Sequence, residues 1–281
     1  MTLPVYVASA FSKNQNGGNK AGVVLNQETL TVNQKMSIAK QLGYAETAFV
    51  TESEIADFKI EYFTPKEEVD LCGHATIGSF TILMHLNKLT KNNYTIETKS
   101  GVLTITIKDD VIFMEQNTPT FYETIDSNEL RDCFDINDID THYPIQIVST
   151  GLKDILVPIK SEKQLSELTP NFEKIKEISE QYDVIGAHLY TFDETRIICR
   201  NFAPLYDINE EAATGTSNGA LACYLYEKHE LVRDTYVFEQ GYSLNSPSEI
   251  LVKLETTEQK KIKKVYVGGR GFYCETKSLS L

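Results

Sequence analysis

One sequence pattern occurs twice in this chain, and it constrains the architecture more than any other feature. Residues 63–78 read FTPKEEVDLCGHATIG, and residues 202–219 read FAPLYDINEEAATGTSNG. Each copy begins Phe-x-Pro, passes through acidic residues, reaches Ala-Thr and continues into a helical pattern that contains glycine. The copies lie about 140 residues apart, which is too long a period for a solenoid. The repeat therefore predicts two similar halves of one fold, each opening a helix at the same place.

The start of a helix is a natural site for an anion, because its first N–H groups are unpaired and the helix dipole is positive there. Two halves that each open a helix in this way predict two helix N-termini aimed into a cleft between the halves. We expect that cleft to bind an anionic group.

Short β-patterned segments dominate both halves, and a few helical patterns interrupt them. Helices are predicted from Thr31, which forms a T-x-x-Q capping box with Gln34, and over residues 75–88, 170–181 and 215–229. Runs of strands with few helices favour an α+β fold with curved, mostly antiparallel sheets. The second and fourth helices are apolar on more than one face, so we expect each sheet to wrap around one of them.

The domain boundary is predicted in the polar stretch 116–126, QNTPTFYETID. This gives a first domain of residues 1–117 and a second of residues 118–267. Whether the C-terminal strand, residues 268–281, returns to the first domain is left open by the sequence.

Composition excludes several classes of protein. The formal net charge of −13 argues against nucleic acid or an anionic membrane as the main partner. No run of about 18 apolar residues predicts a membrane-spanning helix, and the N-terminal sequence lacks the basic region of a signal peptide. The five cysteines are widely spaced, without a CxxC pair, which disfavours disulfides and structural zinc. We expect a cytoplasmic protein.

Glu46 is the first candidate for chemistry. In the strand pattern AETAFV it is predicted to share a face with Ala48 and Val50, because side chains alternate along a strand. A carboxylate there is either desolvated or faces a pocket, and desolvation raises its pKa toward the range of a proton shuttle. The structural alternative is a glutamate at a strand edge, in water or paired with a lysine.

Cys72, Gly73 and His74 are predicted at the start of the second helix. Gly73 would let the chain approach a ligand closely, and His74 can donate, accept or carry a proton. Cys72 would act as a base only if the helix dipole lowered its pKa. The alternative is a capping histidine beside a buried structural cysteine.

The second copy of the repeat offers Glu211, Gly215 and Thr216 at the start of the fourth helix. These residues supply an acidic group, a tight turn and a hydroxyl, and the alternative is a capping turn with exposed glutamates. Asn19, after two glycines, is a weaker candidate that either binds a ligand or caps a turn.

Together these motifs resemble the phenazine-biosynthesis isomerases, the PhzF-like proteins, of the diaminopimelate-epimerase-like fold. The matching pieces cover nearly the whole chain and run in family order: GNKAGVVL, AETAFV, YFTPKEEVDLCGHAT, KSG, GLKDILV, RNFAP, EEAATGTSNGA and EQG. The resemblance implies two similar domains with the active site between them, cofactor-independent proton transfer without a metal, and homodimers.

We expect His74 and Glu211 to act as catalytic residues beside Glu46, by orienting the substrate or relaying the proton. Carried over by motif, the resemblance implies that Glu46 is the catalytic acid/base and that His74 lies in the substrate site. It implies that Gly73 and Thr216 lie in the substrate site. Glu211 stands where the family has an aspartate, and residues 244–248, LNSPS, lack an expected arginine. Both departures put the substrate in doubt.

We therefore expect an isomerase that moves a proton within a small carboxylate substrate. An epimerase that uses two thiols needs a cysteine at each helix start, and the second copy has Ala212 and Ala213 where the first has Cys72. An epimerase or racemase with Glu46 and His74 as opposed bases stays open, as does a binding protein without turnover.

Overall fold

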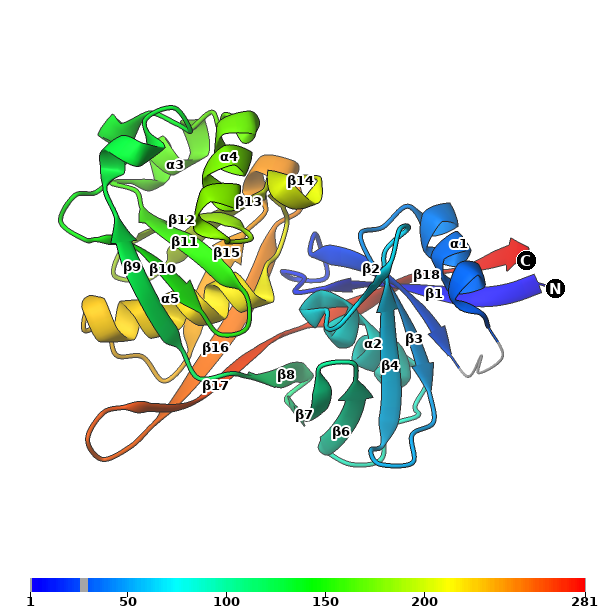
Figure 1. The fold of residues 1–281 in the computed structure, drawn as a ribbon. Coiled ribbons are helices and arrows are strands. Elements are labelled where there is room, and N and C mark those ends of the chain that lie inside the picture. The colour runs from blue at the N-terminus through cyan, green and yellow to red at the C-terminus, as the bar shows by residue number, and fades with distance from the viewer. Residues whose placement is uncertain (1, 26–29, 281) are drawn as a thin grey trace. The chain divides into compact units, whose positions relative to one another are not determined.

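The computed structural model describes residues 2–25 and 30–280, and the chain divides into two compact units (Figure 1). Unit 1 comprises the residues up to Glu115 together with those from Gly268 onward, and unit 2 comprises residues 116–267. The boundary thus follows Glu115, whereas the sequence placed it after residue 117. Among the described residues, no helix has the length and apolar character needed to span a membrane.

Unit 1 is built from nine strands and two helices among the described residues. They are β1 (Thr2–Ala10), β2 (Asn19–Leu25), α1 (Val32–Leu42), β3 (Thr47–Thr51), β4 (Phe58–Phe63), β5 (Glu68–Val69), α2 (Gly73–His85), β6 (Asn93–Thr98), β7 (Gly101–Lys108), β8 (Val111–Gln116) and β18 (Gly271–Ser280).

Unit 2 has a closely similar content. Its elements are β9 (Thr120–Ile125), β10 (Ile145–Ser149), β11 (Lys153–Pro158), α3 (Glu162–Glu167), α4 (Phe172–Tyr182), β12 (Gly186–Phe192), β13 (Ile197–Ala203), β14 (Ile208–Glu211), α5 (Gly215–Lys228), β15 (Tyr236–Gln240), β16 (Ser248–Thr256) and β17 (Ile262–Gly269).

The two units repeat one pairing pattern. In unit 1, β1 pairs antiparallel with β2, β2 parallel with β3, β3 antiparallel with β4, and β4 parallel with β6. In unit 2, β10, β11, β12, β13 and β15 follow the same order and directions. The helix between the last two strands is α2 in unit 1 and α5 in unit 2. The repeat seen in the sequence therefore marks the same position in two copies of one topology.

Each unit encloses its central helix, as the sequence predicted. Residues 74–83 of α2 and 217–225 of α5 are all buried. α2 lies against β1, β2, β3 and β18, and α5 lies against β10, β11 and β16. Burial on every side explains why the two helical patterns show no single apolar face. The predicted α+β class with mostly antiparallel sheets is confirmed.

The first helix forms as its capping signals predict. The Thr31 hydroxyl accepts from the backbone N–H of Gln34, whose side chain in turn accepts from the backbone N–H of Thr31. Gly43 ends the helix with a φ of 71°, and its N–H bonds the carbonyl of Ala39. Glycine suits this left-handed position because it has no Cβ to clash.

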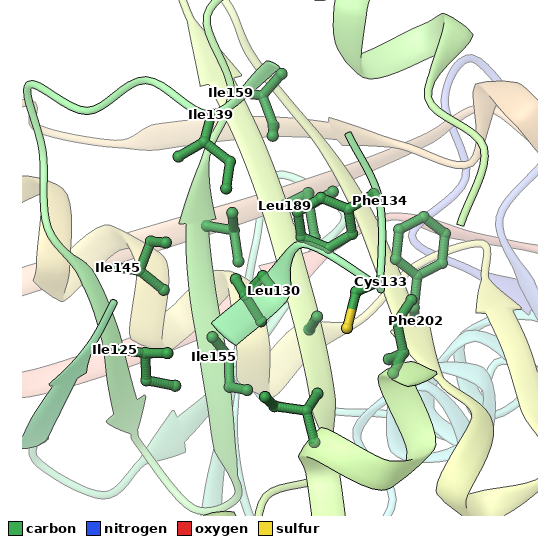
Figure 2. Close-up of a cluster of buried hydrophobic side chains, with 14 of the residues drawn as sticks. Ile125, Leu130, Cys133, Phe134, Ile139, Ile145, Ile155, Ile159, Leu189 and Phe202 are labelled. Carbon is green, nitrogen blue, oxygen red and sulfur yellow. The ribbon is translucent and has the colours of Figure 1, made fainter. Parts of the chain in front are cut away.

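A large apolar cluster fills the other face of the unit 2 sheet (Figure 2). Ile155 of β11, Leu189 of β12 and Phe202 of β13 belong to it, and α3 and α4 contribute further residues. Because side chains alternate along a strand, the neighbours Asp154, His188 and Asn201 point to the α5 side of the sheet.

Two elements of unit 2 were not predicted from the sequence. The stretch 116–126 contains β9, which pairs with β10, and its polar sequence reflects a strand with several exposed side chains. The short helix α3 was not expected, because its six residues offer too little periodicity; the Ser161 hydroxyl caps it by accepting from the N–H of Gln164.

The C-terminal strand settles the point that the sequence left open about its pairing. β18 pairs antiparallel with β1 along its length, from Ser280 opposite Thr2 to Gly271 opposite Ala10. This pairing places the last strand in unit 1.

Candidate active site

Glu46 lies in the short connection between α1 and β3. Because β3 begins at Thr47, Glu46 stands immediately before the strand, whereas the sequence placed it within the strand. All five residues of β3 are buried, so both faces of this strand are covered and the alternation carried no information about an exposed face. The side chain of Glu46 is 17% exposed.

His74 and Cys72 lie beside Glu46 at the start of α2. Glu46 Oε2 is 3.2 Å from His74 Nε2, and the Cys72 sulfur is 3.5 Å from His74 Nδ1. The His74 side chain is 7% exposed. The nitrogen nearest Glu46 is Nε2, and the nitrogen nearest Cys72 is Nδ1. The structure thus brings Glu46, Cys72 and His74 together within unit 1.

The buried hydroxyls of Tyr62 and Thr76 hold the backbone at the start of α2. The Thr76 hydroxyl donates to the carbonyl of Cys72 at 2.7 Å and is 2.6 Å from the hydroxyl of Tyr62. Tyr62 has no exposed surface. These contacts fix the backbone that carries Cys72 and His74, and nothing in the residue pattern pointed to the part played by Tyr62.

The charges of the pair differ from those expected. Burial works to raise the pKa of Glu46, but the contacts with His74 and then Cys72 outweigh it, so the pKa lies below its usual value. Burial alone would lower the pKa of His74, but Cys72 and Glu46 raise it well above its usual value. These contacts favour the ionised form of Glu46 and the protonated form of His74, and the predicted upward shift in the pKa of Glu46 is wrong.

Cys72 is not poised as a base. Burial raises the pKa of its thiol, and the Glu46 carboxylate adds to this effect, while His74 opposes both. The position at the helix N-terminus does not overcome burial, so Cys72 stays a thiol at neutral pH.

The three side chains also have the donor types that bind metal ions. One donor atom from each of Glu46, Cys72 and His74 lies within 4.8 Å of the others. Attraction between the Glu46 carboxylate and a protonated His74 accounts for the closeness of these two residues without a metal ion.

Gly73 is not required by the packing of the fold. A Cβ placed on it would meet only the Met114 methyl carbon, at an ordinary 3.6 Å. Packing therefore does not explain the glycine at position 73. Close approach of a ligand, the role predicted from the sequence, is the explanation to test.

We expect Gly73→Ala to fold normally and to weaken binding of a small carboxylic acid at least tenfold. Alanine favours a helix over glycine by about 1 kcal/mol, so the melting temperature should not fall, whereas the new methyl group would occupy ligand space. Calorimetric titration would measure the affinity. Gly78→Ala is the control, because a Cβ there meets Ala8 and Ala21 at 3.6 Å and should leave binding intact. Wild-type affinity in Gly73→Ala would contradict the close-approach role.

The start of α5 in unit 2 corrects the alignment of the two repeats. α2 begins at Gly73 with Cys72 as its N-cap, and α5 begins at Gly215 with Thr214 as its N-cap. Thr214 therefore stands where Cys72 stands in unit 1, and Ala212 and Ala213 do not. The sequence alignment of the two Ala-Thr pairs was out of register, but its conclusion holds, because this position in unit 2 carries a hydroxyl and no thiol.

The two adjacent glutamates of this segment have different partners. Glu210 forms a two-point ion pair with Arg200, with both N···O distances 2.9 Å, which gives it a structural role. The Glu211 carboxylate accepts from the Thr214 hydroxyl at 2.6 Å. Of the two glutamates, Glu211 is therefore the one bonded to the N-cap residue of α5, Thr214. Gly215 and Thr216 are the first two residues of that helix.

Asn19 is the first residue of β2, opposite Ala10 of β1. Its role in binding stays a prediction, as do the roles assigned to Glu211, Gly215 and Thr216.

Sequence reasoning missed a group of buried polar residues around α5. Asp154, His188, Asn201, Asn218 and Gln240 are each at most 1% exposed. The available signal was a polar residue among the apolar residues of a strand, namely Asp154 in KDILVP, His188 in GAHLYTF and Asn201 in IICRNFA. Such a residue is either a break in the pattern or part of a buried network, and the sequence does not say which.

Comparisons with known proteins agree with this architecture. The family model of phenazine biosynthesis-like proteins, PhzC-PhzF, matches residues 8–277. The uncharacterized isomerase YfhB of Bacillus subtilis is 32% identical, covering 97% of both chains. A phenazine biosynthesis protein of the PhzF family from Bacillus anthracis has a TM-score of 0.91 at 29% identity, with both chains fully covered.

A more distant structure shows how widely the fold is shared. A hydroxyproline epimerase from Agrobacterium vitis has a TM-score of 0.63 at 13% identity, covering 100% of this chain and 93% of its own. The predicted diaminopimelate-epimerase-like fold is confirmed by these neighbours. The relatives named as isomerases, YfhB among them, define the class of the protein as an isomerase. Within that class, the chain belongs to the phenazine biosynthesis-like (PhzF) family.

Proposed function

We propose that this isomerase moves a proton between two carbons of a small, unsaturated carboxylate substrate, with Glu46 as the acid and base and without a cofactor. The observation that carries the proposal is the partly buried pair of Glu46 and His74, with Oε2 and Nε2 3.2 Å apart; their contact lowers the pKa of Glu46 and raises that of His74.

In the proposed step, the Glu46 carboxylate removes a proton from a carbon next to the substrate double bond. The C–H electron pair then forms a new double bond, and the old one accepts the proton at its far end. The proton returns from Glu46, so atoms and charge balance without a second reactant. His74 as an imidazolium stabilises the negative charge that develops on the substrate, since a charged donor acts strongly in a site with little water.

The family resemblance adds residues of unit 2 to this proposal. We retain Glu211 as a substrate-orienting or proton-relaying residue, and Gly215 and Thr216 as binders of an anionic group. A homodimer and a cytoplasmic location also stay part of the proposal, and the latter is supported by five free cysteines.

An epimerase is the second candidate, because the hydroxyproline epimerase shares the fold. The hydroxyl of Thr214 at the position equivalent to Cys72 argues against a mechanism with two thiols. Inversion would instead have to use Glu46 and His74 from opposite sides of one carbon.

Solvent deuterium uptake separates these candidates. The protein is incubated in D₂O with a panel of small unsaturated and cyclic carboxylic acids, and NMR follows deuterium in each acid. We expect an acid that shifts the His74 ring signals also to gain deuterium at one carbon and to yield an isomer with a moved double bond. Deuterium at a stereocentre with loss of optical rotation would favour the epimerase. An acid that binds at His74 without any exchange would contradict catalysis by this pair.

A further inference from the structure

Buried polar side chains surround the start of α5, and the proposed proton transfer uses none of them. Leaving a buried polar group without a partner is costly, and the hydrogen bonds that these side chains make allow their donors and acceptors to be assigned in turn. The members, each at most 1% exposed, are Asp154, His188, Asn201, Ser217, Asn218 and Gln240.

Gln240, the last residue of β15, has only one chemically allowed amide orientation. Its Oε1 faces the N–H of Thr214 at 3.2 Å, and its Nε2 faces the carbonyl of Glu211 at 2.8 Å. An N–H can only donate and a carbonyl can only accept, so exchanging the two atoms would break both bonds. The Nε2 group therefore also donates to the Thr214 hydroxyl oxygen, at 3.0 Å.

The same reasoning fixes Asn218 and then His188. Asn218 Nδ2 donates to the carbonyl of Thr214 at 2.8 Å and to Gln240 Oε1 at 2.9 Å. Its Oδ1 is then left facing His188 Nε2 at 3.3 Å, so that ring nitrogen carries the proton. Burial lowers the pKa of His188 to about 4, so the ring is neutral and its Nδ1 accepts from Asn201 Nδ2 at 3.1 Å.

Taken in order, these bonds form one chain in which every donor points the same way. The Thr214 hydroxyl receives a hydrogen bond from Gln240 and donates its own proton to Glu211 Oε2 at 2.6 Å. Hydrogen bonds aligned in this way polarise one another, so each strengthens the next. The order of the links is Asn201, His188, Asn218, Gln240, Thr214 and Glu211.

We propose that Gln240 is a positioning residue, which sets the direction of the Thr214 hydroxyl and thereby holds the Glu211 carboxylate as an acceptor at the start of α5. The inference rests on the proposed function, because it matters to the reaction only if Glu211 meets the substrate. It extends that function by a residue that the motif comparison did not assign.

The test is Gln240→Glu, paired with Thr214→Val and Thr214→Ser. An ionised carboxylate at position 240 cannot donate, so the Thr214 hydroxyl would turn toward it and Glu211 would lose its donor. Valine removes the hydroxyl without changing the shape of residue 214, and serine puts the hydroxyl back. The control is Gln146→Glu, a buried glutamine of β10 in the same unit that donates to the carbonyl of Tyr122.

Two readouts are needed. Without substrate, long-range ¹H–¹⁵N NMR should show the His188 ring with its proton on Nε2. With the acid that exchanges fastest in the panel above, we expect Gln240→Glu and Thr214→Val to lower kcat roughly ten- to hundredfold, the usual effect of losing a hydrogen bond to a charged group. KM should change little, Thr214→Ser should recover most of the loss, and Gln146→Glu should keep wild-type kcat per folded molecule.

A His188 ring protonated on Nδ1, or on both nitrogens at pH 7, would overturn the assigned direction of the chain. Wild-type kcat in Thr214→Val would overturn the role of the last link. If no acid exchanges with the wild type, the proposed function fails, but the ring NMR still decides the direction of the chain.

Discussion

Glu46→Gln should fold like the wild type and lose nearly all turnover. Glutamine keeps the shape of the side chain but cannot take a proton from carbon, and removing a general base costs on the order of 10²–10⁴-fold in rate. The measurement is the rate of deuterium uptake into the fastest acid of the panel, together with the melting temperature.

The matched control for this variant is Glu61→Gln. Glu61 is a carboxylate of the same unit, 2.6 Å from the Lys35 ammonium and 22% exposed. It therefore tests whether loss of any ion pair of this kind reduces activity. Wild-type turnover per folded molecule is expected for Glu61→Gln. The same turnover in Glu46→Gln would remove Glu46 from the mechanism.

Glu46→Gln should also change the titration of His74. The Glu46 carboxylate is one of the groups that raise the pKa of His74, so its removal should lower that pKa. In the wild type, the stabilising effect of charged His74 is complete below its unfolded pKa, about 6.5, and is lost as pH rises through the folded value. The effect of Glu46 is present above its unfolded pKa, about 4.3, and is lost as pH falls through the lower folded value. NMR titration of the ring in both proteins checks these directions.

Asp154→Asn should gain stability relative to the wild type as the pH rises from 4 to 8. Asp154 is 1% exposed, its Oδ2 accepts from the Ser217 hydroxyl at 2.7 Å, and burial raises its pKa to about 7. The folded state thus holds a proton that the unfolded chain releases near pH 4. This contribution to stability is complete below pH 4, falls between pH 4 and 7, and is gone above the folded pKa.

The shift of Asp154 from 3.8 to about 7 corresponds to a change on the order of 4 kcal/mol in the free energy of unfolding. Asparagine imitates the neutral acid and removes this dependence, so the difference between variant and wild type should grow by that amount from pH 4 to pH 8. Urea unfolding at each pH measures it.

Asp57→Asn is the control for Asp154→Asn, because the pKa of Asp57 is shifted in the opposite direction. Contacts with Lys91 and Thr95 lower the pKa of Asp57, so its contribution appears above pH 4 and disappears as pH falls. Parallel pH profiles for the wild type and Asp154→Asn would show that Asp154 is ionised in the folded protein at neutral pH.

The fold was largely predictable because the signals that specify it are local. The Phe-x-Pro repeat, the Thr31 and Gln34 capping box and the alternation of apolar residues each act within a few positions of the chain. They were enough to predict two similar halves, four of the helices and the α+β class. The short helix α3 and the strand β9 escaped prediction, since the first has too few residues and the second is mostly exposed.

The candidate site was predictable in its members and unpredictable in its electrostatics. The sequence singled out Glu46, Cys72 and His74, but it placed Glu46 inside a strand and assigned it a raised pKa. Burial alone has that effect, and the distance to His74, which reverses it, exists only in the folded unit.

By itself the sequence determined the repeated topology, the start of each central helix and the residue types available for proton transfer. The tertiary structure decided that Thr214 is the counterpart of Cys72, that Glu46 is ionised beside His74, and that a chain of polar side chains points its donors toward Glu211. The physical reason is that pKa values and hydrogen-bond directions depend on distances and burial between residues far apart in the chain, and residue order does not contain those distances.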